Sequence, residues 1–186
     1  MKNNKIILGF VGDLASGKGT VAKYLVKKYK INAYRFSTML RDILRRIYIE
    51  DTRQDMQKLS TFLRENYGQD VMSKVIAKDV ENDPNDLVVV EGIRRPSDIT
   101  YLKEDPNFHL IYITADSKIR WERLVIRNEN PGDDKKSYDD FLKDEQAEAD
   151  KLIKELGKTA EYAINNNDGF EDFYTQIEEI VKKIKT

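Results

Sequence analysis

Short runs of consecutive hydrophobic residues recur along the chain, and they are rich in β-branched side chains. Four clear runs and a weaker fifth one lie at residues 6–11, 87–90, 108–113 and 162–164, and at 32–36. Uninterrupted apolar runs of this length are typical of parallel strands that helices cover on both faces. The pattern therefore predicts a five-stranded parallel sheet inside the protein.

Segments with the helical period of three to four residues separate these runs. They span residues 18–29, 38–48, 53–66, 69–81, 97–104, 117–127, 138–156 and 171–184. Turn-forming residues interrupt the chain between several of them, for example Asp83-Pro84-Asn85 and Asn130-Pro131-Gly132. Strands that alternate with helices in this way predict an α/β fold of three layers, with the sheet in the middle.

Two long stretches between the predicted strands contain only helical pattern. We expect them to form helical insertions at about residues 37–86 and 117–156 of a single domain. The domain core would then comprise residues 1–36, 87–116 and 157–186. In open α/β sheets the ligand crevice lies at the carboxyl ends of the strands, so helices inserted there would cover and shape a binding site.

Composition narrows the possible functions. The 186 residues suffice for one domain, and 32 lysines and arginines nearly balance 33 aspartates and glutamates, so the net charge is −1. No overall attraction to polyanions follows, and we do not expect nucleic acid as a partner. The chain has no cysteine and one histidine, which excludes thiolate and multi-histidine metal centres and is typical of a reducing cytoplasm. No apolar stretch reaches the about 20 residues that span a membrane.

A glycine-rich loop connects the first predicted strand to the first predicted helix and reads G-D-L-A-S-G-K-G-T. Its glycines allow backbone N–H groups to converge on phosphate oxygens, its lysine reaches the β and γ phosphates, and the helix N-terminus adds partial positive charge. We therefore predict a polyphosphate site formed by Gly12, Asp13, Ala15, Ser16, Gly17, Lys18, Gly19 and Thr20.

The loop departs from the strict phosphate-loop pattern at one position. That pattern has serine or threonine directly after the lysine, whereas Gly19 occupies that position here and Thr20 follows it. Asp13 is also unusual, because phosphates repel an acidic side chain. It either points away from the phosphates or helps to position metal or water.

The order Gly19-Thr20 resembles the loop of adenylate kinase and its nucleotide-kinase relatives, and a resemblance to the P-loop kinase superfamily extends over most of the chain. Residues 36–41 (F-S-T-M-L-R) and 90–96 (V-E-G-I-R-R-P) are similar to acceptor-binding segments of nucleoside monophosphate kinases. Residues 52–68 resemble the acceptor-side helices of deoxynucleoside monophosphate kinases. The resemblance implies a P-loop kinase-like fold, ATP and Mg²⁺ as cofactors, an acceptor-binding first insertion and a second insertion that acts as a lid.

The same resemblance implies residues for the acceptor and for the adenine ring. For the acceptor phosphate these are Ser37, Arg41, Arg64, Arg94 and Arg95. Arg95 matches the spacing from the acid in adenylate kinase, and Arg94 matches that of dephospho-CoA kinase-like relatives, so both remain candidates. Residues 165–170 are similar to the loop that flanks adenine in dephospho-CoA kinase-like proteins, which implies Asn167 and Gly169.

Further charged residues point to catalysis. Glu91 ends the predicted strand at residues 87–90, where its carboxylate would lie near a phosphate-bound Mg²⁺, through water, with Thr20 as the second metal-binding group. Arg123 and Arg127 share one helix face with Arg120. They either neutralise charge on the transferred phosphoryl group, as kinase lid arginines do, or form a solvated basic face.

The acceptor is the most open question. A hydroxyl acceptor benefits from a carboxylate base, and dephospho-CoA kinase and shikimate kinase carry an aspartate shortly after their second strand, where this chain reads Ser37-Thr38-Met39. A phosphate acceptor needs arginines instead. We therefore predict a MgATP-dependent kinase with a small-molecule acceptor, a nucleoside or deoxynucleoside monophosphate. The alternatives are a hydroxyl-acceptor kinase such as dephospho-CoA kinase, and a nucleotide-binding switch or slow ATPase that acts on a partner.

Overall fold

A five-stranded parallel sheet forms the centre of the computed structural model, which describes residues 5–128, 132–145 and 148–185. The strand order is β2-β3-β1-β4-β5, and all four neighbouring pairs are parallel. The strands are β1 (Ile6–Val11), β2 (Ala33–Arg35), β3 (Leu87–Ile93), β4 (Phe108–Thr114) and β5 (Tyr162–Asn165). The predicted sheet is confirmed, and the carboxyl ends of its strands meet at one edge.

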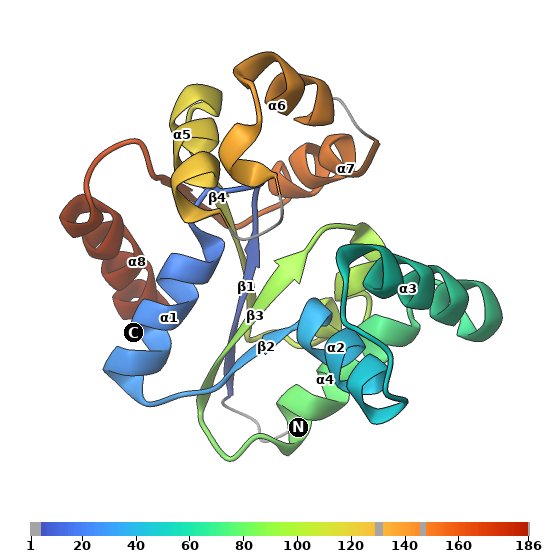
Figure 1. The fold of residues 1–186 in the computed structure, drawn as a ribbon. Coiled ribbons are helices and arrows are strands. Elements are labelled where there is room, and N and C mark those ends of the chain that lie inside the picture. The colour runs from blue at the N-terminus through green and yellow to red at the C-terminus, as the bar shows by residue number, and fades with distance from the viewer. Residues whose placement is uncertain (1–4, 129–131, 146–147, 186) are drawn as a thin grey trace.

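Helices cover both faces of this sheet (Figure 1). They are α1 (Lys18–Tyr29), α2 (Phe36–Arg46), α3 (Arg53–Tyr67), α4 (Val71–Asn82), α5 (Ser117–Arg127), α6 (Tyr138–Glu145), α7 (Glu148–Gly157) and α8 (Phe170–Ile184). Short 3₁₀ helices lie at Pro96–Ile99, Leu102–Glu104 and Asp133–Lys135. Within the described ranges, no helix is long and apolar enough to cross a membrane.

The hydrophobic core is divided by the sheet into two layers. On one side α1 and α8 pack against Leu8 and Phe10 of β1. On the other side α2, α4 and α7 pack in one cluster with Ile7 and Val11 of the same strand. All four of these β1 side chains are fully buried, which explains why the strand reads as a continuous apolar run.

Two predicted element boundaries are wrong in ways that matter for the site. β3 continues to Ile93, so Glu91 lies inside the strand and is paired with Arg35 of β2, instead of following the strand end. The single helix predicted over residues 97–104 is two short 3₁₀ helices. The reason is local, because the carboxylate of Asp98 turns back and accepts hydrogen bonds from the backbone N–H groups of Arg94 and Arg95.

The helix predicted over residues 138–156 is also divided. α6 buries Phe141 beneath the guanidinium of Arg120 in α5, whereas α7 buries Ile153 and Leu156 in the core cluster on the sheet. The two halves therefore have different packing partners. The predicted continuation between them falls on residues 146–147, which lie outside the described residues.

Candidate nucleotide-binding site

The glycine-rich loop connects β1 to α1 at the carboxyl edge of the sheet. Gly17 has a φ of 109°, and a Cβ atom there would lie 2.3 Å from the Nδ2 atom of Asn166. A Cβ atom on Gly12 would lie 2.2 Å from the backbone oxygen of Ile113. Both positions therefore require glycine. In the described structure no side chain caps the N-terminus of α1, so its first N–H groups can bind an anion.

Lys18 folds back over its own loop. Its Nζ atom donates hydrogen bonds to the backbone oxygens of Gly12 at 2.6 Å and Asp13 at 2.7 Å. Burial, together with the positive charges of Arg94 and Arg120, lowers the pKa of Lys18 to about 7, and the negative charges of Asp13 and Glu91 oppose this shift. A polyphosphate would provide the anionic partner that two neutral carbonyl groups do not replace.

Asp13 is buried, with 4% of its surface exposed. Its Oδ2 atom accepts a hydrogen bond from the hydroxyl of Tyr112 at 3.3 Å. Its Oδ1 atom has no hydrogen-bond partner in the part of the chain that the structure describes. Burial raises the pKa of Tyr112, and the charge of Asp13 raises it further. The carboxylate thus lies against β4, while the backbone oxygen of Asp13 binds Lys18.

Glu91 forms an ion pair that the sequence analysis missed. Arg35 donates from Nε to Oε1 and from Nη2 to Oε2, both at 2.9 Å. The Glu91 side chain is only 11% exposed, against 35% for Arg35. The pair lies directly beside Gly19, where a Cβ atom would be 3.1 Å from Arg35 Nη2 and 3.6 Å from Glu91 Oε2. A correct strand order would have suggested it, because β2 and β3 place the two residues in register.

Mg²⁺ chemistry is compatible with this arrangement. Among the described residues no group of three or more acidic, histidine or cysteine side chains could hold a metal alone. Nucleotide-bound Mg²⁺ needs only one or two protein oxygens besides the phosphates. The hydroxyl of Thr20 and the carboxylate of Glu91 are the groups that would hold it.

The buried ion pair of Arg64 and Asp98 holds the loop that follows β3. Arg64 Nη2 lies 2.6 Å from Asp98 Oδ1, and Arg64 Nη1 donates to the backbone oxygen of Gln69. The other carboxylate oxygen of Asp98 accepts the N–H groups of Arg94 at 2.9 Å and Arg95 at 3.0 Å. Arg64 is only 7% exposed. The structure therefore places it beneath the loop, whereas the side chains of Arg94 and Arg95 are exposed.

Arg41 and Ser37 lie one turn apart on α2. The Nη1 atom of Arg41 donates to the hydroxyl of Ser37 at 3.3 Å, and its Nε atom lies 3.7 Å from a carboxylate oxygen of Asp51. Its side chain remains 30% exposed. Arg41 can therefore still contact a ligand, in contrast to Arg64.

The three arginines of α5 differ in their surroundings. Arg120 is 3% exposed, forms an ion pair with Glu145 of α6, and donates to the backbone oxygen of Leu14 in the phosphate loop. Arg123 is half-buried and donates to the backbone oxygen of Asn166 at 2.9 Å, and burial lowers its pKa. Arg127 lies exposed in the last turn of the helix. Arg120 is therefore buried in internal contacts, whereas Arg123 and Arg127 retain exposed surface.

Asn166 is a second residue that the sequence analysis missed. It is 4% exposed, and its Nδ2 atom donates to the backbone oxygen of Ser16 in the phosphate loop at 2.8 Å. The neighbouring Asn167, which was predicted to bind adenine, forms two hydrogen bonds with Asp116. Gly169 is the N-cap of α8. The loop after β5 is thus joined to the phosphate loop, but through Asn166 and not through Asn167. Three consecutive asparagines in the sequence indicate a polar loop without showing which one turns inward.

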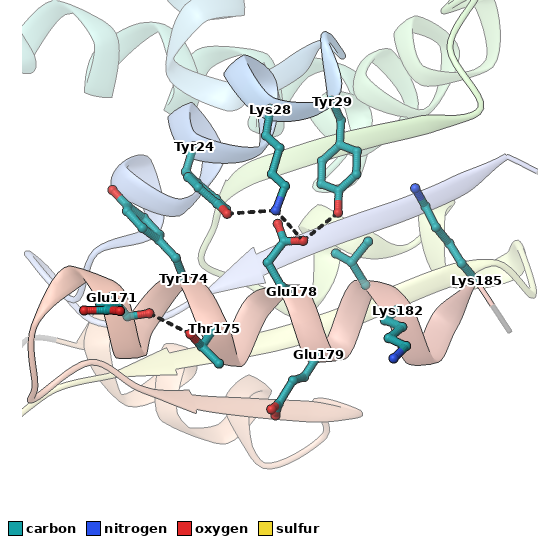
Figure 2. A pocket seen from close by; sticks show the side chains of 11 residues that line it. Tyr24, Lys28, Tyr29, Glu171, Tyr174, Thr175, Glu178, Glu179, Lys182 and Lys185 are labelled. Carbon is teal, nitrogen blue, oxygen red and sulfur yellow. Dashed lines mark hydrogen bonds and ion pairs between the residues drawn. The ribbon is translucent and has the colours of Figure 1, made fainter.

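A groove of about 820 Å³ lies elsewhere, between α1 and α8 (Figure 2). The rings of Tyr24 and Tyr174 stack there with centroids 4.0 Å apart. Glu178 forms an ion pair with Lys28 and accepts a hydrogen bond from the hydroxyl of Tyr29, both at 2.8 Å. The described lining comes from α1, α8 and Lys185. The groove is therefore separate from the phosphate loop.

Comparisons with known proteins agree with this geometry. The AAA domain family matches residues 11–142. A UPF0200 protein from Pyrococcus abyssi is 31% identical over 96% of this chain and 97% of that protein, and one from Methanococcus maripaludis is 28% identical with the same coverage. A solved shikimate kinase from Bacteroides thetaiotaomicron has a TM-score of 0.66 at 13% identity, covering 97% of this chain and 99% of that one. TT1252 from Thermus thermophilus has a TM-score of 0.63 at 15% identity, covering 98% and 99%. At such identities the structural likeness shows the fold alone.

Proposed function

Because this chain belongs to the AAA domain family and to the UPF0200 proteins, and has the fold of the P-loop kinases, we propose that it is a MgATP-dependent kinase. Its acceptor in this proposal is a nucleoside or deoxynucleoside monophosphate. The observation that carries the proposal is the phosphate loop. Its helix N-terminus has no side-chain cap and Lys18 is buried, so both favour binding of an anionic ligand.

Each residue of the loop has a role that follows from its position. The N–H groups at the start of α1 bind the phosphates, and Lys18 leaves its two carbonyl partners to contact the β and γ phosphates. Thr20, and Glu91 through water, would hold Mg²⁺, which would supply positive charge to the phosphate oxygens. Arg123 and Arg127 add charge on the opposite side, which matters most when the phosphoryl group is transferred.

Two observations favour a phosphate over a hydroxyl as the acceptor. First, Asp98 binds the backbone N–H groups of Arg94 and Arg95 and so holds these two arginines directly after β3 at the sheet edge. Arg41 on α2 is also partly exposed. A hydroxyl acceptor would need a carboxylate base, yet both carboxylate oxygens of Glu91 are bound by Arg35. The site therefore has arginines that can neutralise an acceptor phosphate, but its carboxylate at Glu91 is not free to remove a proton from a hydroxyl.

The proposal is tested by measuring ADP release with the purified protein and MgATP. Common nucleoside and deoxynucleoside monophosphates, dephospho-CoA and shikimate are compared as acceptors, and Lys18→Ala serves as the inactive control. ADP release that depends on a monophosphate supports the proposal. Release with a hydroxyl acceptor alone would replace it by the hydroxyl-kinase alternative, and ATP hydrolysis without a phosphorylated product would replace it by a switch.

A further inference from the structure

Gly19 occupies the place where strict phosphate loops carry the serine or threonine that binds Mg²⁺. The structure shows what stands beside this glycine. The guanidinium of Arg35 lies so close that a Cβ atom at position 19 would be 3.1 Å from its Nη2 atom, and the carboxylate of Glu91 follows at 3.6 Å. An arginine–glutamate pair therefore lies where the strict pattern has a neutral hydroxyl group.

The pair is firmly held. Arg35 is the last residue of β2 and is in register with Glu91 of β3, so the sheet itself sets their spacing. Both hydrogen bonds of the fork measure 2.9 Å, and the carboxylate is largely removed from solvent. Bidentate arginine–carboxylate bonds of this kind are among the stronger polar contacts in proteins.

We propose that the positive charge of Arg35 controls how strongly the affinity for the nucleotide depends on the Mg²⁺ concentration. It neutralises Glu91 when no metal is present and repels Mg²⁺ when the metal arrives with the phosphates. This inference rests on the proposed function, since it assumes that ATP binds at the phosphate loop. It assigns Arg35 a role as a positioning and specificity residue, not as a catalytic one.

The charges around the pair support this assignment. Lys18, Arg94 and Arg120 contribute positive charge at the loop, and Asp13 and Glu91 contribute negative charge. With Arg35 included, four cations face two anions. Removing Arg35 would leave three cations and two anions, and this smaller positive excess favours a divalent metal and disfavours a metal-free polyphosphate. Loss of Arg35 should therefore shift these two affinities in opposite directions.

The test is to measure ATP binding by calorimetry over a range of free Mg²⁺ concentrations, without acceptor. In Arg35→Ala the Mg²⁺ concentration that gives half of the full gain in ATP affinity should fall by about fivefold or more, because a nearby like charge is removed. Binding of metal-free ATP should weaken in the same variant. Arg35→Lys keeps the charge but loses the planar fork, so in both measurements it should lie closer to the wild type than Arg35→Ala does.

Arg45→Ala is the matched control, because it removes an exposed arginine of α2 that pairs with Asp51. It should change neither measurement. If Arg35→Ala instead weakens both kinds of binding, or leaves the Mg²⁺ dependence unchanged, Arg35 only supports the strand ends and the inference is overturned while the proposed function stands. If the wild-type protein binds no ATP at any Mg²⁺ concentration, the proposed function fails and the inference fails with it.

Discussion

Each of the two helical segments between the strands contains one buried arginine that binds a neighbouring loop, but the two arginines bind different loops. In the first insertion, Arg64 of α3 pairs with Asp98, whose second oxygen holds the loop that carries Arg94 and Arg95. In the second insertion, Arg120 of α5 pairs with Glu145 and donates to the phosphate loop itself, at the backbone oxygen of Leu14.

This difference separates the two sides of the candidate site. The proposed acceptor side is organised within its own loop. It lies beside the phosphate loop at the Arg35–Glu91 pair next to Gly19, and the charge of Arg94 acts on Lys18. The proposed lid side is attached to the phosphate loop by Arg120 and, through Asn166, by Arg123. Changes on the second side should therefore affect the handling of ATP, and changes on the first side should affect the acceptor.

Lys18→Ala should have the largest effect, because it removes the charge on which both sides depend. We expect phosphoryl transfer to be lost, by about 10³-fold or more, since an electrostatic contact to the reacting phosphates is removed. The fold should remain, as judged by circular dichroism and thermal melting. Near-normal turnover at saturating MgATP would contradict the assignment of the phosphate loop.

Arg64→Ala and Arg120→Ala compare the contributions of the Arg64–Asp98 and Arg120–Glu145 ion pairs. Arg64→Ala leaves the buried carboxylate of Asp98 without its ion-pair partner and should lower the free energy of unfolding by about 3–5 kcal/mol, measured by urea denaturation. Arg120→Ala removes the partner of Glu145, whose side chain is 11% exposed, and should lower this free energy by a smaller amount. Lys58→Ala breaks the exposed pair with Asp55 and should change it by no more than about 0.5 kcal/mol. Of the two arginine variants, only Arg120→Ala should also weaken ATP binding. Equal loss of ATP affinity in both would remove the distinction between the two sides.

Arg123→Ala and Arg127→Ala test the ligand-facing part of the lid side. Each should lower kcat by about 10²-fold, because charge at the transferred group counts mainly in the transition state. The dissociation constant of ATP, measured by calorimetry without acceptor, should change less. A change in melting temperature with unaltered kcat would show that these arginines form only a solvated or structural face.

Arg41→Ala and Arg95→Ala test the acceptor side in the same assay. Loss of a bidentate arginine–phosphate contact, worth about 1.5–3 kcal/mol, should raise the acceptor KM by about tenfold or more. ATP affinity without acceptor should stay constant. Lysine at either position should restore the KM only in part, because it lacks the planar fork. An unchanged KM in both variants would favour a hydroxyl acceptor.

The pH dependence of MgATP binding should show the smallest effect. The pKa of Lys18 in the free protein is about 7, and bound phosphates favour its charged form, so binding takes up a proton above that pH. The dissociation constant should therefore rise by about fivefold between pH 7 and pH 8. Lys18→Gln should remove this slope. A dissociation constant that is flat in the wild type would show that Lys18 remains fully charged in the free protein.

The sequence by itself determined the parallel sheet and the phosphate loop. Both depend on residues that are close together in the chain: the buried run of β1, the glycines at positions 12 and 17, and Lys18 at the start of α1. Local patterns did not predict every element, since residues 97–104, predicted as one helix, form parts of two short 3₁₀ helices, and Asp98 binds the backbone before the first of them.

Only the tertiary structure decided which polar residues meet at the site. Arg35 contacts Glu91 across 56 positions of sequence, Arg64 contacts Asp98 across 34, and Asn166 contacts Ser16 across 150. These partners depend on strand order and on how the insertions pack, and neither leaves a periodic pattern in the sequence. The charge of each side chain is visible in the sequence, but its partner depends on the fold, because a buried charge must be compensated by whichever group the fold brings beside it.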